Sequence, residues 1–280
     1  MKENLKVTHY RNGEDLNRFN ESLPTAPNIN QNWSNLEVGT FYNYNSSYGH
    51  LYNGHAVKDE RGICPVGWNV PSDEDVIILE IYLGMDEEVT NYRNVYRGTN
   101  QGSKLANNDY LWNDGVLESD SEFGTTGFNV IPSGYIQSDG ILLSSNNRGT
   151  FWTNTTYIED SGIEKMFERI ISSDNKGIYR ESSNLNWAFS VRCMQDVVNG
   201  CIDPDACNYN SEANIDDGTC EYNSGTLYVS LEGDDDNCGS QEQPFASIQY
   251  AIDSSIDGEE VLVSAGTYYE NINFNGKNIA

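Results

Sequence analysis

Four aspartates with side chains suited to calcium lie close together in a short stretch rich in cysteine. They are Asp203, Asp205, Asp216 and Asp217. Calcium takes about six to eight oxygen ligands, and short loops rich in Asp and Asn supply them. The spacing is not that of an EF-hand loop, and a solvated acidic surface is the alternative. We expect calcium as the cofactor here, with residues 234–236 as a second candidate site.

The same stretch contains most of the sulfur chemistry of the chain. Its four cysteines are Cys201, Cys207, Cys220 and Cys238. Four cysteines allow three disulfide pairings, and the sequence does not select one of them. Zinc is the alternative, but no Cys-x-x-Cys spacing and no nearby histidine supports it. We therefore expect disulfides.

Other residues with chemical potential form no recognisable catalytic set. The three histidines, His9, His50 and His55, lie outside any nucleophile motif such as Gly-x-Ser-x-Gly. Carboxylates are so abundant that no pair stands out as a glycosidase acid and nucleophile. Trp112 lies in a polar stretch and is the candidate ligand-binding residue, because an exposed indole would stack on a ligand such as a sugar ring, although core packing is the favoured role of the indole even there. We expect binding rather than catalysis.

Charge and composition exclude two classes of partner. The chain of 280 residues carries 43 acidic and 16 basic side chains, a formal net charge of -27. Such a field repels phosphate backbones and anionic membranes. The sequence contains no apolar run near the roughly 20 residues of a membrane span. We expect neither nucleic-acid binding nor membrane insertion.

The elements that must position these residues fall into three segments. Residues 197–280 contain 16 acidic side chains and one basic one, so the composition changes near 197. We assign domains to 1–196, 197–224 and 225–280. In the first domain, Ser72 can cap a helix that ends at Gly84. Residues 164–171 are predicted to form a second, short helix, and the remaining strand-like runs indicate an α+β domain.

Several motifs of the first domain match one family in order. They are Glu3-Asn4-Leu5-Lys6, Tyr10-Arg11-Asn12-Gly13, Tyr52-Asn53-Gly54-His55-Ala56-Val57, Cys64-Pro65-Val66-Gly67-Trp68-Asn69-Val70-Pro71-Ser72-Asp73 and Ser190-Val191-Arg192-Cys193. Residues 1–196 thereby resemble the Fibrobacter succinogenes major paralogous domain of secreted bacterial proteins. The resemblance implies a disulfide between Cys64 and Cys193, with two free thiols as the alternative. It also implies an extracellular or cell-surface location, with a signal peptide upstream of a truncated start.

Three further resemblances concern fold. The Trp-x-Val-Pro-Ser-Asp motif, its helix and the late Arg-Cys strand are similar to C-type-lectin-like folds, although the sugar-binding triplets of calcium lectins do not occur. Residues 197–224 resemble a Cys-rich repeat of flavobacterial secreted proteins, with a spacing like that of thrombospondin-type calcium repeats. Residues 225–280 resemble the start of a right-handed parallel β-helix. Since a β-helix needs about three repeats to bury a core, we expect further coils.

The function that these observations favour is a non-catalytic extracellular binding or scaffold module of a large secreted or surface bacterial protein. Its partner would be a glycan or a surface protein. The alternative is a fragment of a polysaccharide-degrading β-helix enzyme whose catalytic coils are missing here. A purely structural stalk or adhesin is a third hypothesis. Fold alone does not choose among them.

Overall fold

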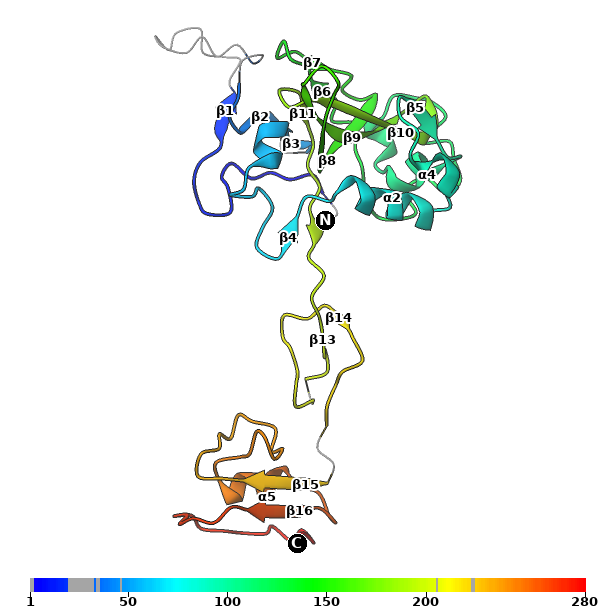
Figure 1. The fold of residues 1–280 in the computed structure, drawn as a ribbon. Helices are drawn as coiled ribbons and strands as arrows, with labels where there is room; N and C mark the ends of the chain where they lie inside the picture. The colour runs from blue at the N-terminus through cyan, green and yellow to red at the C-terminus, as the bar shows by residue number, and fades with distance from the viewer. Residues whose placement is uncertain (1–2, 20–32, 34–35, 46, 205, 223–224) are drawn as a thin grey trace. The chain divides into compact units, whose positions relative to one another are not determined.

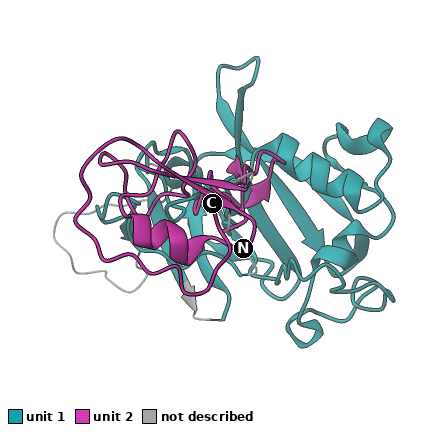
Figure 2. Cartoon of the chain, turned by 90° about the horizontal axis from the view of Figure 1, so that it is seen from below, with its two compact units in different colours: residues 1–196 teal, residues 197–280 magenta. Residues whose placement is uncertain are grey.

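The chain folds into two compact units, residues 1–196 and residues 197–280 (Figure 2). The computed structural model describes residues 3–19, 33, 36–45, 47–204, 206–222 and 225–280. The Cys-rich segment and the segment after it share the second unit, because the disulfide Cys207–Cys238 joins them.

The first unit contains two main sheets (Figure 1). The six-stranded sheet has the order β1 (Asn17–Phe19), β2 (Thr40–Asn45), β3 (Gly49–Asn53), β11 (Ala188–Phe189), β6 (Tyr135–Ile136) and β7 (Leu142–Leu143). The four-stranded sheet has the order β5 (Val95–Arg97), β10 (Asn175–Asn184), β9 (Glu164–Ser172) and β8 (Arg148–Ile158), all antiparallel. A short pair joins β4 (Trp68–Asn69) to β12 (Met194–Gln195). The α+β class expected from the sequence is confirmed.

The longest described helix is α2 (Asp73–Tyr82), and it begins where the sequence predicts. The Ser72 hydroxyl accepts the backbone N–H of Asp75, and the Asp75 carboxylate accepts the backbone N–H of Ser72. This reciprocal capping box satisfies two donors that a helix start leaves unpaired. Gly84 follows with φ +94°, a left-handed conformation that favours glycine and ends the helix. The other helices of the unit are α1 (Gly54–Lys58), α3 (Glu87–Thr90) and α4 (Gln101–Leu105).

The predicted second helix over 164–171 is wrong, because these residues form strand β9. This strand lies between β8 and β10 and is hydrogen-bonded to both. Phe167, Arg169 and Ile171 lie on one side of it, while Met166 and Glu168 lie on the other, and all five are buried. Because both sides of the strand are buried, its sequence lacks the alternation of apolar and polar residues that distinguishes a strand from a helix.

Two hydrophobic clusters lie on opposite sides of the four-stranded sheet. Phe151, Ile171 and Ile178 pack with Val76 of α2 and with Leu105 of α4. The neighbouring residue Trp152 points the other way, into a cluster with Phe189, Tyr52 and Met166. Adjacent residues of a strand face opposite sides of the sheet, so β8 divides the unit into two cores.

A buried ion network fixes α2 to the four-stranded sheet. Arg97 of β5 and Arg169 of β9 both contact Glu80 Oε1, at 2.8 and 2.7 Å. Arg169 Nη1 also donates to Asp73 Oδ1 at 2.7 Å, and Arg180 of β10 donates to both oxygens of Asp73. Burial alone would raise the pKa of Asp73, but Arg180 and Arg169 hold it below its usual value. Each charge therefore depends on its partners.

The second unit has little regular structure and two disulfides, Cys201–Cys220 and Cys207–Cys238. Strands β13 (Asn199–Gly200) and β14 (Ile215–Asp216) pair in parallel. Strands β15 (Thr226–Val229) and β16 (Glu260–Val263) also pair in parallel, and α5 (Ile248–Ser254) lies between them in sequence. A small core gathers Leu227, Val229, Phe245 and Ala251.

The last residue continues this parallel stacking. The Ala280 N–H donates to the Glu259 carbonyl at 3.1 Å, and the Val261 N–H donates to the Ala280 carbonyl at 2.7 Å. This pattern is that of a parallel ladder, with Ala280 opposite Glu260. Glu260 is therefore paired on one side with Thr226 and on the other with Ala280.

In neither unit do the described residues include a helix with the length and apolar character needed to span a membrane.

Replacing Glu80 with Gln is expected to destabilise the first unit by about 3–5 kcal/mol, because it leaves buried guanidinium groups without their counter-charge. Urea unfolding of the variant and of the native chain measures this change. The matched control is Glu74→Gln, an exposed glutamate on the same helix, which is expected to shift stability by less than about 0.5 kcal/mol. Equal effects of the two substitutions would contradict a structural role for the network.

Removing the Cys64–Cys193 disulfide is expected to cost about 4–5 kcal/mol, since the bond closes a loop with a sequence separation of 129. The paired variant Cys64→Ser/Cys193→Ser isolates this bond from the two disulfides of the second unit. Thermal melting of the first unit's transition, with and without reductant, measures the change. A variant that melts like the native chain would show that the bond does not constrain the fold.

Candidate functional site

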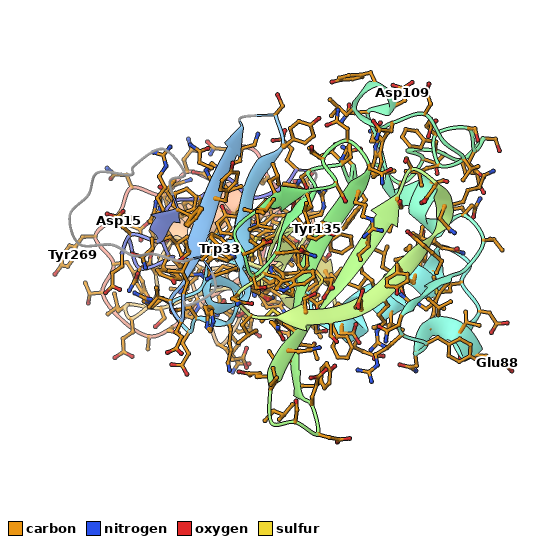
Figure 3. All side chains as sticks on the ribbon, turned by 90° about the horizontal axis from the view of Figure 1, so that it is seen from above. Asp15, Trp33, Glu88, Asp109, Tyr135 and Tyr269 are labelled. Atoms are coloured by element: carbon orange, nitrogen blue, oxygen red, sulfur yellow. A yellow bond between two sulfur atoms is a disulfide. The ribbon has the colours of Figure 1, made fainter. Side chains whose placement is uncertain are left out.

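The side of the four-stranded sheet opposite α2 and α4 gathers polar and aromatic side chains. Figure 3 views the sheet from this side, with those helices behind it. We call it the glutamate face and define it by Tyr96, Arg148, Glu168, Tyr179 and Glu181. Cross-strand partners point to the same side, so their register brings these five side chains together.

Two glutamates lie at the centre of this face. Glu168 of β9 and Glu181 of β10 are direct cross-strand partners. The side chains of such partners are attached about 4.5–5.5 Å apart. Glu168 is 1% exposed, while Glu181 is only partly buried. Two carboxylates at this separation repel each other when both are ionised.

The hydrogen bonding of Glu168 is incomplete. The Ser183 hydroxyl donates to its Oε1 at 2.9 Å, but its buried Oε2 has no partner among the described residues. Burial raises the pKa of Glu168 well above its ordinary value. Burial also raises the pKa of Glu181, although Lys165 and Arg148 oppose that shift. A buried carboxyl group with an unpaired oxygen is rare in a purely structural role and is typical of functional sites.

Two pairs of aromatic rings belong to this side of the sheet or to the cluster beside it. Tyr96 and Tyr179 form an edge-to-face pair with ring centroids 5.1 Å apart. Tyr135 of β6 and Trp187 are nearly parallel, with an interplanar angle of 7° and centroids 5.8 Å apart. All four rings are partly buried, so packing holds them in place while leaving ring surface accessible.

The second aromatic pair packs against a hydrophobic cluster that borders Glu168. Tyr135, labelled in Figure 3, and Trp187 pack against the cluster that contains Trp152 and Met166. Trp152 is the cross-strand partner of Glu168, and Met166 precedes it on the same side of β9. The glutamate face therefore adjoins this cluster through Trp152, and Arg148 lies at its β8 edge.

A shallow hollow of about 660 Å³ is a second candidate site on the first unit. Glu37, His55, Lys58, Glu164 and Leu185 contribute to its lining. Lys58 Nζ already contacts Glu164 Oε1 at 2.5 Å, and burial lowers the pKa of His55. Lys58 and Glu164 thus neutralise each other, and no Phe, Tyr or Trp is among the described lining residues, so the hollow offers no large ring for a ligand to stack on.

Apart from His55, which contributes to the hollow, the family motifs serve the fold rather than either candidate site. Asn53 caps α1 by accepting the backbone N–H of Ala56 at 3.0 Å. Arg192 Nη1 donates to Asn4 Oδ1 at 2.7 Å inside the unit. Cys64 is bonded to Cys193, the pair implied by the family resemblance. These contacts link the start of the unit to its last strands.

The prediction that Trp112 is an exposed ligand platform is wrong. Its side chain is 6% exposed and belongs to the core beneath α2 and α4. Its indole N–H donates to the Asn107 carbonyl at 3.0 Å. The polar neighbours in sequence form a surface turn, while the indole fills the interior, and sequence position alone does not reveal that direction.

The predicted calcium ligands are engaged in local contacts. Asp216 accepts the backbone N–H of Gly218, and Asp217 accepts the backbone N–H of Thr219. Asp203 accepts the Tyr222 hydroxyl at 2.6 Å, while Asp205 lies outside the described residues. Within the described part of the chain, no three His, Cys, Asp or Glu side chains gather as a metal site. Calcium binding here stays a prediction.

The second acidic candidate, residues 234–236, has a similar role. Asp235 accepts the backbone N–H groups of Ala246 and Ser247 and also the Ser247 hydroxyl. These contacts hold the chain just before α5. The carboxylates of this turn therefore position backbone, and calcium at this turn also stays a prediction.

Sequence reasoning missed Glu168 and Glu181 because it assigned residues 164–171 to a helix. A glutamate within the apolar run Met166–Ile171 is unusual in a buried strand, and that was the available signal. Recognising it requires the strand assignment, since only cross-strand pairing brings Glu181 beside it.

The first unit is a disulfide-linked α+β module of the extracellular type. The family model of the Fibrobacter succinogenes major domain matches residues 1–195, and the chain belongs to this bacterial family. No curated protein and no solved structure matches the chain.

Replacing Glu168 with Gln is expected to make stability less sensitive to pH. The folded-state pKa is raised, so native stability falls as pH rises above the unfolded value of about 4.3. The free energy of unfolding of the variant minus that of the native chain should therefore increase with pH, by up to about 1.4 kcal/mol per pH unit. Below the unfolded pKa this difference should vanish. Urea unfolding across this pH range measures the difference.

The control for this prediction is Glu164→Gln on the same strand. Lys58 lowers the pKa of Glu164, so this substitution is expected to have the opposite sign above the unfolded pKa. A pH-independent effect of Glu168→Gln would show that the native side chain does not change its protonation on folding.

Proposed function

We propose that the first unit is a non-catalytic binding module of a secreted or cell-surface bacterial protein, and that it binds a glycan on the glutamate face. One observation carries this proposal: a buried carboxyl group with an unpaired oxygen lies on the same side of the sheet as the Tyr96–Tyr179 pair, and the cluster beside it carries the Tyr135–Trp187 pair. Neither the hollow near His55 nor the second unit combines these features among the described residues.

Sugar chemistry fits this combination. A sugar ring presents apolar C–H groups on its faces and hydroxyl groups around its edge. Partly buried Trp and Tyr rings offer rigid, amphipathic surface to the faces. The Glu181 carboxyl and the Arg148 guanidinium offer hydrogen bonds to the hydroxyl groups. Side chains already held by packing lose little conformational entropy when a ligand binds.

Chemistry also supports the proposed location. Three disulfides join all six cysteines in pairs, and such bonds persist mainly in oxidising compartments. The net charge of -27 disfavours nucleic acid and anionic surfaces as partners. A neutral or cationic glycan, or a surface protein that carries one, is the compatible partner.

We further propose a C-type-lectin-like arrangement for the first unit and the first coil of a parallel β-helix for residues 225–280. The capped helix α2 against a small antiparallel sheet supports the former. The parallel stacking of Thr226, Glu260 and Ala280 supports the latter. This stacking also favours the second candidate function, a part of a polysaccharide-degrading β-helix enzyme that acts outside these residues.

Replacing Trp187 with Ala is expected to weaken glycan binding by about tenfold or more, since it removes one stacking ring. The measurement is binding of the full chain to an array of plant, algal and bacterial oligosaccharides, followed by calorimetry on the positives. The control is Tyr82→Ala, an exposed tyrosine on α2 across the sheet, which should leave affinity unchanged. The proposal fails if no glycan binds, or if both variants bind like the native chain.

A further inference from the structure

We propose that the glycan bound by the glutamate face carries a protonated amine, as a glucosamine residue does, and that Glu181 contacts the ammonium while Glu168 adds a second negative charge. This inference rests on the proposed function, because it names the ligand class of the same site. Its basis is the cross-strand Glu168–Glu181 pair, which shares its side of the sheet with Tyr96 and Tyr179 and with one guanidinium, that of Arg148.

The charges that face the pair leave an excess of one negative charge when both glutamates are ionised. Arg148 on β8 acts on Glu181 and on Tyr179. Lys165 on β9 also acts on Glu181, but its Nζ already contacts Glu159 at 2.7 Å. From β5 and β10 the facing groups are the hydroxyls of Tyr96 and Tyr179. A ligand with one positive charge therefore neutralises this excess.

Burial makes it unfavourable for both glutamates to be ionised when no ligand is bound. The raised pKa values of Glu168 and Glu181 mean that the folded protein resists ionising both groups. A cation within about 4–6 Å favours the ionised form of a carboxyl group and reverses such a shift. A neutral hydroxyl supplies one hydrogen bond but no charge, so it leaves the repulsion between the two carboxylates in place.

The surrounding rings favour the same chemistry. Ammonium groups are attracted to the faces of Trp and Tyr rings within about 6 Å of the centroid. Tyr96 and Tyr179 lie beside the glutamates on the same side of the sheet, and Tyr135 and Trp187 pack on the cluster of Trp152, the cross-strand partner of Glu168. An amino sugar can place its ring against an aromatic face while its ammonium meets Glu181, which a bare cation cannot do.

A metal ion fits the glutamate face less well than an amine. Calcium takes about six to eight oxygen ligands, and the face offers two carboxyl groups beside one positive guanidinium. The described residues of this face gather no three acidic, histidine or cysteine side chains. Rings around a carboxylate pair suit an organic cation.

The test compares two oligosaccharides of equal length, one of glucosamine and one of N-acetylglucosamine, at a pH where the free amine is protonated. The native full chain is expected to bind the glucosamine oligomer at least about tenfold more tightly in calorimetry. Glu181→Gln and Glu168→Gln are each expected to reduce this preference several-fold while the N-acetylated oligomer binds as before. Trp187→Ala is expected to weaken binding of both.

A matched control separates the site from general attraction to an acidic protein. Glu74→Gln removes an equal charge from the exposed surface of α2 and should leave the preference unchanged. A preference that persists in Glu168→Gln and Glu181→Gln, or that falls equally in Glu74→Gln, overturns the inference. Equally tight, Glu181-dependent binding of poly-L-lysine would also overturn it, since the site would then recognise amines without the sugar.

The two proposals fail in different ways. Binding of neutral glycans that depends on Trp187 but shows no preference for the amine rejects the further inference and leaves the proposed function standing. An absence of binding to either oligomer, together with a negative oligosaccharide array, rejects both proposals.

Discussion

The contact between α2 and the four-stranded sheet depends on buried charges that pair with one another across it. Asp73 and Glu80 of α2 bind arginines from three adjacent strands, so one helix sets the spacing of β5, β10 and β9. Transferring such groups from water costs more than most single contacts return, and a misplaced partner would leave a charge unpaired in the interior. The position of the helix, its capping box and the strand register therefore depend on one another. The same register also determines which side chains are neighbours on the opposite side of these strands.

The register of β9 and β10 also creates the glutamate face. Because side chains alternate along a strand, placing Arg169 and Arg180 toward α2 places Glu168 and Glu181 on the other side, as neighbours. A one-residue slip would exchange the two sets and separate the arginines from Asp73 and Glu80. The stability of the ion network thus holds together two carboxyl groups that repel each other, an arrangement that costs folding free energy and gives the face its chemical character. The family motifs support this arrangement from a distance, through Asn53, Arg192 and the Cys64–Cys193 bond.

The second unit follows a different principle. It buries few apolar side chains, and disulfides replace much of the core that its Cys-rich segment lacks. Its aspartates accept backbone N–H groups in tight turns, which explains their abundance without requiring an ion. Its two described strand pairs, β13–β14 and β15–β16, are both parallel. The two units are thus stabilised by different means, one by packing and buried charge and the other mainly by covalent cross-links.

The sequence by itself determined the α+β class, the capped helix at Ser72 and the family, because caps, breakers and motif residues act through near neighbours in the chain. It could not determine strand β9, whose two buried sides remove the alternation on which strand prediction relies. It could not determine whether the Trp112 side chain is buried or exposed, since the direction of a side chain depends on what packs around it. It also missed the glutamate face, because Glu168 and Glu181 become neighbours only through strand pairing. Tertiary structure decided these features, since cross-strand register and burial join residues that no local pattern connects.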